Sequence, residues 1–219
     1  FARWILAFKT IGEVKSLNEF YKKLNIYWYG GNEGHTQQVP EEAEFLFKSA
    51  SNLKNILEVG FNGGHSSETF LNSSSNAIIE SVDIGFHHYV KFGSFYLKKK
   101  YPGRFFLHIG KSKDILPKII KQKNIFDLIF IDGSHEYRDV FLDIKNGIEL
   151  SHASTLIILD DVYYPKNNSH KENFDSHNMG PTKAWLEFID SGKIKEINYK
   201  EFATNNTNKR SLVVGKSIK

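Results

Sequence analysis

The organisation of this chain is clearest in one stretch, Asn55-Ile56-Leu57-Glu58-Val59-Gly60-Phe61-Asn62-Gly63-Gly64-His65-Ser66. It starts as an apolar run that favours a β-strand, continues through closely spaced glycines, and leads into a polar segment with helix character. The pattern predicts a strand, a tight turn and the start of a helix. Glycine permits positive φ and a close approach of ligand to backbone, while a helix start offers unpaired N–H groups. Such a turn also closes an ordinary βα unit, so alone it does not establish a ligand site.

The spacing of these glycines differs from two common nucleotide-binding motifs. Asn62 stands where the dinucleotide fingerprint Gly-x-Gly-x-x-Gly has its middle glycine, and the Gly-Lys-Ser/Thr of a P-loop is missing. The next predicted strand, 77–82, leads to Asp83, about 20 residues beyond the turn, where a carboxylate can bind both hydroxyls of a ribose. The turn and Asp83 together predict a nucleoside site.

Length and composition limit the class of protein. The 219 residues, 40% of them hydrophobic and 14% aromatic, suffice for one sizeable core. The chain has no cysteine, which excludes disulfides, thiolate metal sites and cysteine nucleophiles. No apolar run approaches the roughly 18 to 20 residues that span a membrane, and no signal-peptide pattern is visible. We therefore predict a soluble, cytoplasmic protein without a membrane partner, and its first residue, Phe1, is consistent with a fragment of a longer chain.

The chain is basic, with a net charge of +4 and a pI of about 9.0. Most of the positive charge comes from lysine, because there are only four arginines: Arg3, Arg104, Arg138 and Arg210. Nucleic-acid binders favour arginine for bidentate contacts, and the lysines here are spread over many predicted helices. We interpret the charge as a lysine-rich surface and expect no nucleic-acid partner.

From Asn55 onwards, predicted strands and helices alternate. The strands are predicted at 55–59, 77–82, 105–109, 126–131 and 155–159, and the helices near 65–72, 87–101, 113–123, 136–150 and 181–190. Two further strands, 193–198 and 211–215, close the domain. Alternation implies parallel pairing through right-handed crossovers, with a ligand crevice at the carboxyl ends of the strands. We predict an α/β, doubly wound, mostly parallel seven-stranded sheet over residues 36–219.

Residues 1–35 are predicted to form an N-terminal helical extension. Ser16 can cap a helix with an apolar face, and Pro40 is typical of the first turn of a following helix. Two segments are candidate lids over the crevice: the glycine-rich run 27–34, and the long polar segment 161–180, which we predict to be a substrate-facing loop.

Acidic residues follow two of the predicted strands. Asp132 ends the fourth strand, with His135 three residues on, and the fifth strand ends at Asp160 and Asp161. Neighbouring strand ends lie about 5 Å apart, so three carboxylates would repel one another unless they shared a cation. Oxygen ligands suit Mg²⁺ or a similar divalent ion. Plainer interpretations stay open: Asp132 caps a helix or contacts the cofactor, Asp160-Asp161 forms a turn, and His135 is a surface or capping residue.

On these motifs the chain resembles the class I S-adenosylmethionine-dependent methyltransferases. Within that family it is most similar to the metal-dependent O-methyltransferases of the macrocin and mycinamicin sugar type and, more distantly, to catechol O-methyltransferase. The resemblance covers roughly residues 36–190. Besides the opening stretch, its motifs are Gln38-Val39-Pro40-Glu41-Glu42, Val82-Asp83, His108-Ile109-Gly110-Lys111-Ser112, Ile131-Asp132-Gly133-Ser134-His135-Glu136-Tyr137 and Leu159-Asp160-Asp161-Val162.

The resemblance implies a role for each matching residue. S-adenosylmethionine would bind at a set comprising Glu58, Gly60, Asn62, Gly64, Ser66, Asp83, Gly110, Lys111, Ser112 and Asp132. The metal, Mg²⁺ or a similar ion, would be held by Asp132, Asp160 and Asp161, and His135 would be the general base. Two departures stand out: Lys111 replaces an acid common in the family, and His152-Ala153-Ser154 replaces a glycine pair, which we expect to change only a turn.

We therefore predict an enzyme that methylates a hydroxyl of a small molecule, a sugar or another diol. Methyl transfer to oxygen requires alignment of donor and acceptor and a larger share of alkoxide, which a divalent cation and a neutral imidazole can provide. Two alternatives remain: a nucleic-acid 2′-O-methyltransferase, favoured by the pI but opposed by the acidic cluster, and a degenerate, non-catalytic cofactor-binding module. The sequence identifies neither the acceptor nor the oligomeric state, and a homo-oligomer is one of the open alternatives.

Overall fold

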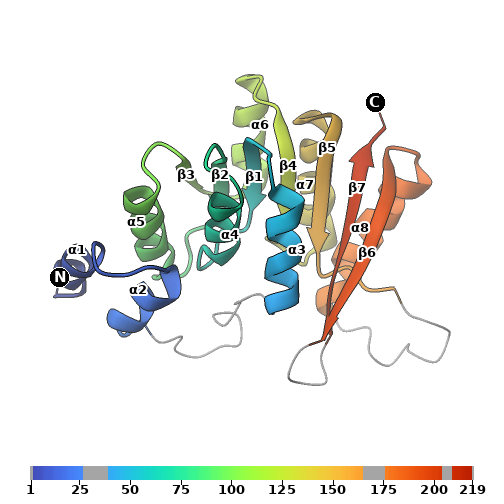
Figure 1. Cartoon of the computed structure of the whole chain (residues 1–219). Coiled ribbons are helices and arrows are strands. Elements are labelled where there is room, and N and C mark those ends of the chain that lie inside the picture. Colours follow the sequence, from blue (N-terminus) through green and yellow to red (C-terminus); the bar gives the residue numbers. More distant parts are fainter. Residues whose placement is uncertain (1, 27–38, 165–175, 204–208, 219) are drawn as a thin grey trace.

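The computed structural model describes residues 2–26, 39–164, 176–203 and 209–218, which form helices on both faces of one β-sheet (Figure 1). The helices are α1 (Ala2–Thr10), α2 (Leu17–Lys23), α3 (Pro40–Ala50), α4 (His65–Ser73), α5 (Val90–Lys100), α6 (Ser112–Lys121), α7 (Tyr137–Glu149) and α8 (Ser176–Asp190). The strands are β1 (Asn55–Val59), β2 (Ile78–Asp83), β3 (Phe105–Ile109), β4 (Phe126–Ile131), β5 (Ser151–Asp160), β6 (Ile194–Ala203) and β7 (Lys209–Ser217). Within these described ranges, no helix combines the length and the apolar composition that a bilayer crossing requires.

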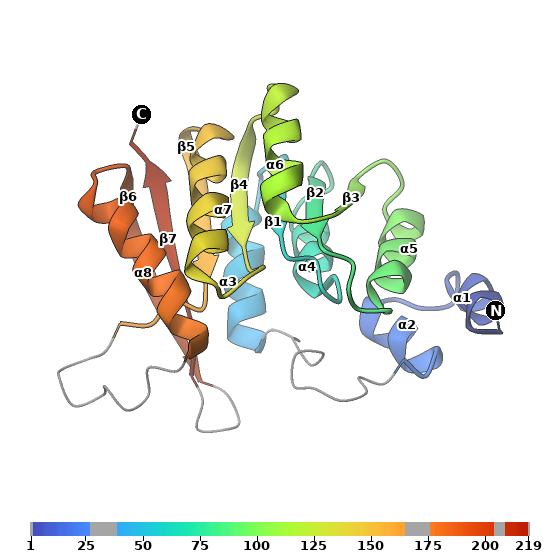
Figure 2. The ribbon, with the colours of Figure 1, turned by 180° about the vertical axis from the view of Figure 1, so that it is seen from behind.

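The sheet has seven strands in the order β3-β2-β1-β4-β5-β7-β6. Strand β1 pairs in parallel with β2 and β4, and β3 and β5 extend this parallel part, whereas β7 runs antiparallel to β5 and β6. Helices α3, α4 and α5 cover one face and α6, α7 and α8 the other (Figures 1 and 2). The predicted doubly wound, mostly parallel sheet is confirmed. The carboxyl ends of β1 to β5 therefore meet along one edge, where α/β sheets bind ligands.

The sheet separates two hydrophobic cores, because successive residues of a strand point to opposite faces. In β1, Ile56 packs in one core and Leu57 in the other. The N-terminal helices belong to the first core, where Ala7, Leu17 and Phe20 are fully buried. Burying a leucine or phenylalanine side chain contributes about 1.5 to 3 kcal/mol, so the main core holds this helical extension in place.

Two predicted helix starts are confirmed. Ser16 caps α2, since its Oγ accepts a hydrogen bond from the Glu19 N–H at 3.3 Å. Pro40 is the first residue of α3, where the missing N–H has no intrahelical partner to lose. Local sequence signals therefore set these two ends.

Strand β5 differs from its prediction. It begins at Ser151 rather than 155, so that residues 152–154, expected in a turn, lie within the strand. The Thr155 hydroxyl accepts from the His152 N–H at 2.8 Å and donates to the Phe126 carbonyl at 2.6 Å. This side-chain bridge spans the register shift at the start of the β4–β5 pairing. Strands β6 and β7 likewise extend beyond their predicted ranges.

The prediction of a loop over 161–180 is wrong for its last residues. Helix α8 begins at Ser176 and carries Pro181 inside it, although proline favours a helix boundary. Gly180 packs closely against the start of α7, since a Cβ there would lie 1.9 Å from the His135 carbonyl oxygen and 2.8 Å from the Tyr137 nitrogen. The remaining part of that predicted lid, 165–175, and the other candidate lid, 27–34, lie outside the described residues.

Candidate active site

A pocket of about 390 Å³ opens at the carboxyl ends of β1, β2 and β3, a volume typical of small-molecule sites. Apolar walls come from Val59, Val82 and Ile84. Five residues predicted to bind the cofactor line the same pocket: Gly60, Asp83, Gly110, Lys111 and Ser112. The fold thus brings together residues from three separate strand ends.

The turn after β1 requires glycine at position 60. Gly60 has a φ of +99°, and a Cβ there would lie 1.9 Å from the Asp132 carbonyl oxygen. The Gly60 N–H donates to the Val82 carbonyl at 2.8 Å, and the Asp132 N–H donates to the Val59 carbonyl at 2.8 Å. These bonds lock the ends of β1, β2 and β4 together, so a side chain at position 60 would force β1 and β4 apart.

Asp83 is held in place by backbone donors. Its Oδ2 accepts from the Asn62 N–H at 2.8 Å, and its Oδ1 accepts from the Gly85 N–H at 2.7 Å. Asn62 adopts a left-handed φ of 45°, and its side-chain Oδ1 accepts from the Tyr89 hydroxyl at 2.5 Å. The glycine turn and the predicted ribose-binding acid therefore form one hydrogen-bonded unit.

Glu58 lies in the core behind the turn and does not line the pocket. Its two carboxylate oxygens accept hydrogen bonds from the hydroxyls of Ser66, Ser67 and Ser81, at 2.5 to 2.6 Å. Burial raises the pKa of Glu58 to about 7, although these serine hydroxyls oppose the shift. Glu58 and Ser66, both predicted as cofactor-binding residues, therefore connect β1 to the start of α4 and shape the turn from behind.

The N-terminal helices also hold the turn. The buried Tyr21 hydroxyl on α2 donates to the Gly63 carbonyl at 2.7 Å. Gly64 is left-handed with a φ of +86°, and a Cβ there would lie 2.6 Å from the Phe61 ring. Sequence patterns placed Tyr21 only on an apolar helix face, so its contact with the glycine turn was not predicted.

The far wall of the pocket contains acids that the sequence analysis did not single out. Asp139 and Asp143 of α7 reach the pocket opposite Lys111 and Ser112. Asp143 is 1% exposed, and burial raises its pKa to about 7, opposed by a hydrogen bond from Ser112. Helix α7 therefore supplies two acids to this pocket.

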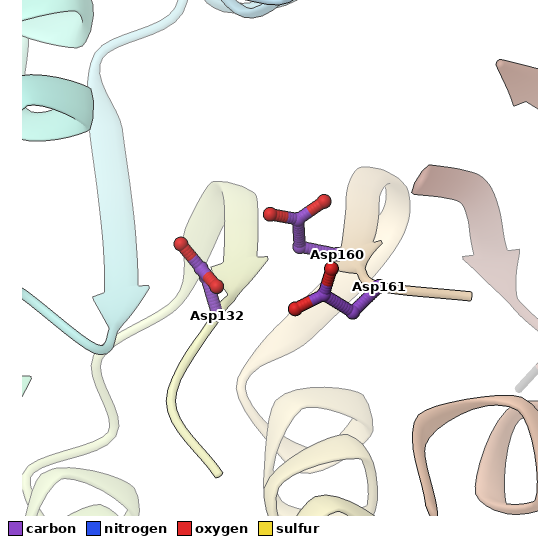
Figure 3. A group of neighbouring side chains, drawn as sticks. All are labelled: Asp132, Asp160 and Asp161. Atoms are coloured by element: carbon purple, nitrogen blue, oxygen red, sulfur yellow. The ribbon is translucent and has the colours of Figure 1, made fainter. Parts of the chain in front are cut away.

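Beside the pocket, the predicted metal ligands converge at the ends of β4 and β5. One carboxylate oxygen from each of Asp132, Asp160 and Asp161 lies within 4.8 Å of the others, and Figure 3 shows the three side chains facing a common space. Asp161 adopts a left-handed φ of 57°, which is uncommon outside glycine and is tolerated best by aspartate and asparagine. The position of Asp161 in the cluster therefore depends on an unusual backbone conformation as well as on the residue type.

The electrostatics of this cluster favour a cation. Burial, followed by the charges of Asp160 and Asp161, raises the pKa of Asp132 well above its usual range. Burial and then the charge of Asp161 raise the pKa of Asp160 to about 6. Asp160 Oδ1 is buried and has no hydrogen-bond partner among the described residues. Crowded carboxylate oxygens with an unpaired acceptor are the donor set that Mg²⁺ or a similar hard ion prefers, so the residues fit such an ion.

His135 lies against the same cluster. Its Nε2 is 2.7 Å from Asp161 Oδ2, with both side chains partly exposed. An ionised carboxylate can only accept, so in this arrangement Nε2 carries a proton and the neutral ring has its basic electron pair on Nδ1. The predicted general base is therefore next to the predicted metal site.

Two further residues complete the cluster. Arg210 on β7 donates from Nη2 to Asp160 Oδ2 at 2.8 Å, and its Nε lies 3.1 Å from Glu42 Oε2 on α3. Burial and then the charge of Asp160 raise the pKa of Glu42 to about 8. The sequence analysis placed Glu42 in the motif around Pro40 and Arg210 among the positive charges, but gave neither a role in the site, because nothing local connects them to the strand ends.

Comparison with known families explains this arrangement. A search of curated protein sequences finds no match, but residues 57–162 match the model of a family described as a methyltransferase domain. This part of the chain therefore resembles a methyltransferase domain. The matched segment runs from β1 to just past the acidic pair, so it includes the glycine turn, Asp83 and all three predicted metal ligands.

Solved structures of methyltransferases share the fold of this chain. The O-methyltransferase from Bacillus cereus, in complex with SAH, has a TM-score of 0.70 and 16% identity, covering 98% of this chain and 97% of its own. TomG from Streptomyces achromogenes is an O-methyltransferase involved in tomaymycin synthesis, solved in complex with SAM. It has a TM-score of 0.70 and 13% identity, and the match covers 97% of this chain and 95% of TomG. The SAH-bound methyltransferase PaMTH1 of Podospora anserina has a TM-score of 0.68 and 16% identity, and the match covers 93% of this chain and 88% of PaMTH1. At these identities the likeness establishes a common fold.

The predicted site residues thus fall into three groups. One group lines the pocket, one forms the acidic cluster with His135 at its side, and the third shapes the turn without lining the pocket: Glu58, Asn62, Gly64 and Ser66. Asp132 was predicted for both cofactor and metal, and the structure places its carboxylate in the acidic cluster.

Proposed function

We propose that this chain is an S-adenosylmethionine-dependent O-methyltransferase, assisted by a divalent cation, that acts on a hydroxyl of a small molecule, a sugar or another diol. One observation carries the proposal: a nucleoside-sized pocket and a carboxylate cluster occupy neighbouring strand ends of one crevice. Neighbours of the same fold bound to SAM or SAH support the choice of methyl donor.

The pocket supplies the donor side. The oriented Asp83 carboxylate would accept from the ribose hydroxyls, since each of its oxygens retains lone-pair capacity beyond its single backbone bond. Val59, Val82 and Ile84 offer apolar surface to a base. Gly60 lines the pocket and has no side chain, so the rest of the donor can approach the backbone of the turn there.

The cluster supplies the acceptor side. Asp132, Asp160 and Asp161 would hold the cation, which when bound supplies the positive charge that lowers the pKa of an acceptor hydroxyl. A diol offers two adjacent oxygens to such a charge, which favours sugars and related diols as acceptors. His135 would take the proton, and Asp161 keeps its ring oriented through Nε2.

Two other functions remain testable alternatives. A nucleic-acid 2′-O-methyltransferase would have to bring phosphates towards three carboxylates, which like-charge repulsion disfavours. A non-catalytic cofactor-binding module would use the pocket but give the cluster and His135 no role. The arrangement of the cluster beside the pocket favours the enzyme.

A methyl-transfer assay tests the proposal. Labelled S-adenosylmethionine is incubated with the protein and a panel of sugars, nucleotide sugars, catechols and short RNAs, with Mg²⁺ or with EDTA. We expect transfer to a diol, loss of transfer in EDTA, and recovery when Mg²⁺ is restored. Transfer to RNA alone would favour the first alternative, while cofactor binding without transfer to any acceptor would favour the second.

A further inference from the structure

Arg210 joins two buried carboxylates that come from opposite ends of the chain. Its Nη2 is 2.8 Å from Asp160 Oδ2, and its Nε is 3.1 Å from Glu42 Oε2. The side chains of Asp160 and Glu42 are 2% and 1% exposed, while that of Arg210 is 23% exposed. The guanidinium therefore uses two different nitrogens to hold β5 and α3 together, a geometry that its rigid planar fork permits.

This bridge makes the two oxygens of Asp160 different. Oδ2 is occupied by Arg210, whereas Oδ1 has no hydrogen-bond partner among the described residues. A buried acceptor without a partner is destabilising, so Oδ1 would gain from a ligand. Glu42 contributes no oxygen to the cluster of three acids, and its contact with the guanidinium makes it an anchor for Arg210.

We propose that Arg210, anchored by Glu42, is a positioning residue for the divalent cation: it fixes the Asp160 carboxylate so that Oδ1 is the oxygen presented to the ion. This inference rests on the proposed metal-assisted function. Ligating carboxylates are commonly held by such outer contacts, and losing one weakens metal binding about 10- to 100-fold. The role is structural support of a ligand, since Arg210 does not touch the reacting groups.

A purely electrostatic view of Arg210 predicts the opposite result. A guanidinium beside a cation site repels the ion, so removing the charge should tighten metal binding. Positioning predicts that removal weakens binding, because Asp160 loses its fixed orientation. The two views also differ for lysine, which keeps the charge but cannot hold two carboxylates through a planar fork.

Calorimetry with MnCl₂ alone separates these views. We expect Arg210→Gln to weaken Mn²⁺ binding about 10- to 100-fold and Arg210→Lys to weaken it by less. The matched control is Arg3→Gln, the same change on the exposed face of α1, which should bind Mn²⁺ like the wild type. Binding of S-adenosylhomocysteine should stay unchanged in every variant, since Arg210 does not line the pocket.

The outcomes distinguish this inference from the proposed function. Unchanged or tighter Mn²⁺ binding by Arg210→Gln overturns the positioning role and leaves the metal-assisted function standing. If Arg210→Gln does not fold, Arg210→Lys decides, because wild-type affinity in that variant also overturns the positioning role. A wild-type protein that binds no Mn²⁺ yet transfers methyl groups in EDTA overturns both the metal site and the inference.

Discussion

The two sides of the crevice treat their buried carboxylates in opposite ways. Beneath the pocket, Glu58 meets three serine hydroxyls, and both oxygens of Asp83 meet backbone donors. At the neighbouring strand ends, Asp160 keeps an unpaired oxygen, and one guanidinium serves both Asp160 and Glu42. Both oxygens of Glu58 and of Asp83 are thus hydrogen-bonded within the protein, whereas the acidic cluster is crowded with like charge.

We interpret this difference as separating Glu58, which supports the turn, from the acids of the cluster, which a cation would satisfy. Buried polar groups in native proteins are normally hydrogen-bonded, and each exception calls for a physical explanation. The Glu58 network satisfies this rule, so it supports the fold of the turn. The acidic cluster does not, and a bound cation would remove its repulsion. Variants on the two sides should therefore fail in different ways.

The largest effect is expected from Asp161→Ala. It removes one of three converging carboxylates, so metal-dependent turnover should be abolished, while the affinity for S-adenosylhomocysteine stays within about twofold because Asp161 does not line the pocket. Turnover and calorimetric affinity are measured on the same preparation. Asp190→Ala, an exposed acid on α8, is the control. Full activity in Asp161→Ala, or activity that EDTA leaves unchanged, would show that the cluster is not a catalytic metal site.

The next largest effect is expected from His135→Ala. Loss of a general base lowers the rate by about 10² to 10⁴, while Mn²⁺ and cofactor still bind. The rising limb of the pH–rate profile should disappear, because the neutral imidazole is the active form. His152→Ala is a matched control, since His152 pairs with Asp127 at 3.2 Å, away from both the pocket and the acidic cluster. An unchanged rate and pH profile in His135→Ala would mean that another group accepts the proton of the acceptor hydroxyl.

The Glu58 network predicts a pH dependence of stability. Glu58 stays protonated in the folded protein up to about pH 7, against an ordinary pKa of 4.5, so between these values the unfolded chain binds fewer protons. The free energy of unfolding should therefore fall as the pH rises through this window. The fall should be about 3 kcal/mol larger in the wild type than in Glu58→Gln, since one pKa unit corresponds to about 1.4 kcal/mol.

Urea unfolding at several pH values measures this difference. The control is Glu41→Gln, an exposed acid on α3, which should unfold with the same pH dependence as the wild type. Parallel stability curves for the wild type and Glu58→Gln would mean that the serine hydroxyls compensate fully for burial of the charge.

The smallest of these effects concerns Asp83. A hydrogen bond to a charged group contributes about 1.5 to 3 kcal/mol, so Asp83→Ala should weaken S-adenosylhomocysteine binding by roughly 10- to 100-fold. Glu80→Ala is the control, because Glu80 belongs to the same strand but does not line the pocket. Calorimetry compares the two variants. Equal affinity for S-adenosylhomocysteine in Asp83→Ala and the wild type would mean that the ribose binds in another part of the crevice.

Several features of this protein were predictable from the sequence. The glycine turn, Asp83 and the three acids all lie at strand ends, and strand–helix alternation implies that these ends meet along one edge. Local periodicity and chain topology together therefore located both halves of the candidate site. The same reasoning failed for the start of α8, where the helix continues through Pro181 and Gly180 packs closely against the start of α7.

The sequence alone determined the order of strands and helices and the residues at the strand ends, because these depend on short-range patterns of side chains. Only the tertiary structure decided how each buried acid is paired. Tyr21 reaches Gly63 across 42 positions, and Arg210 reaches Asp160 across 50. Such pairs follow from the order of strands in the sheet and from helix packing, which no local pattern encodes. An acidic side chain is consequently hydrogen-bonded by serines at Glu58 and crowded with like charge at Asp160.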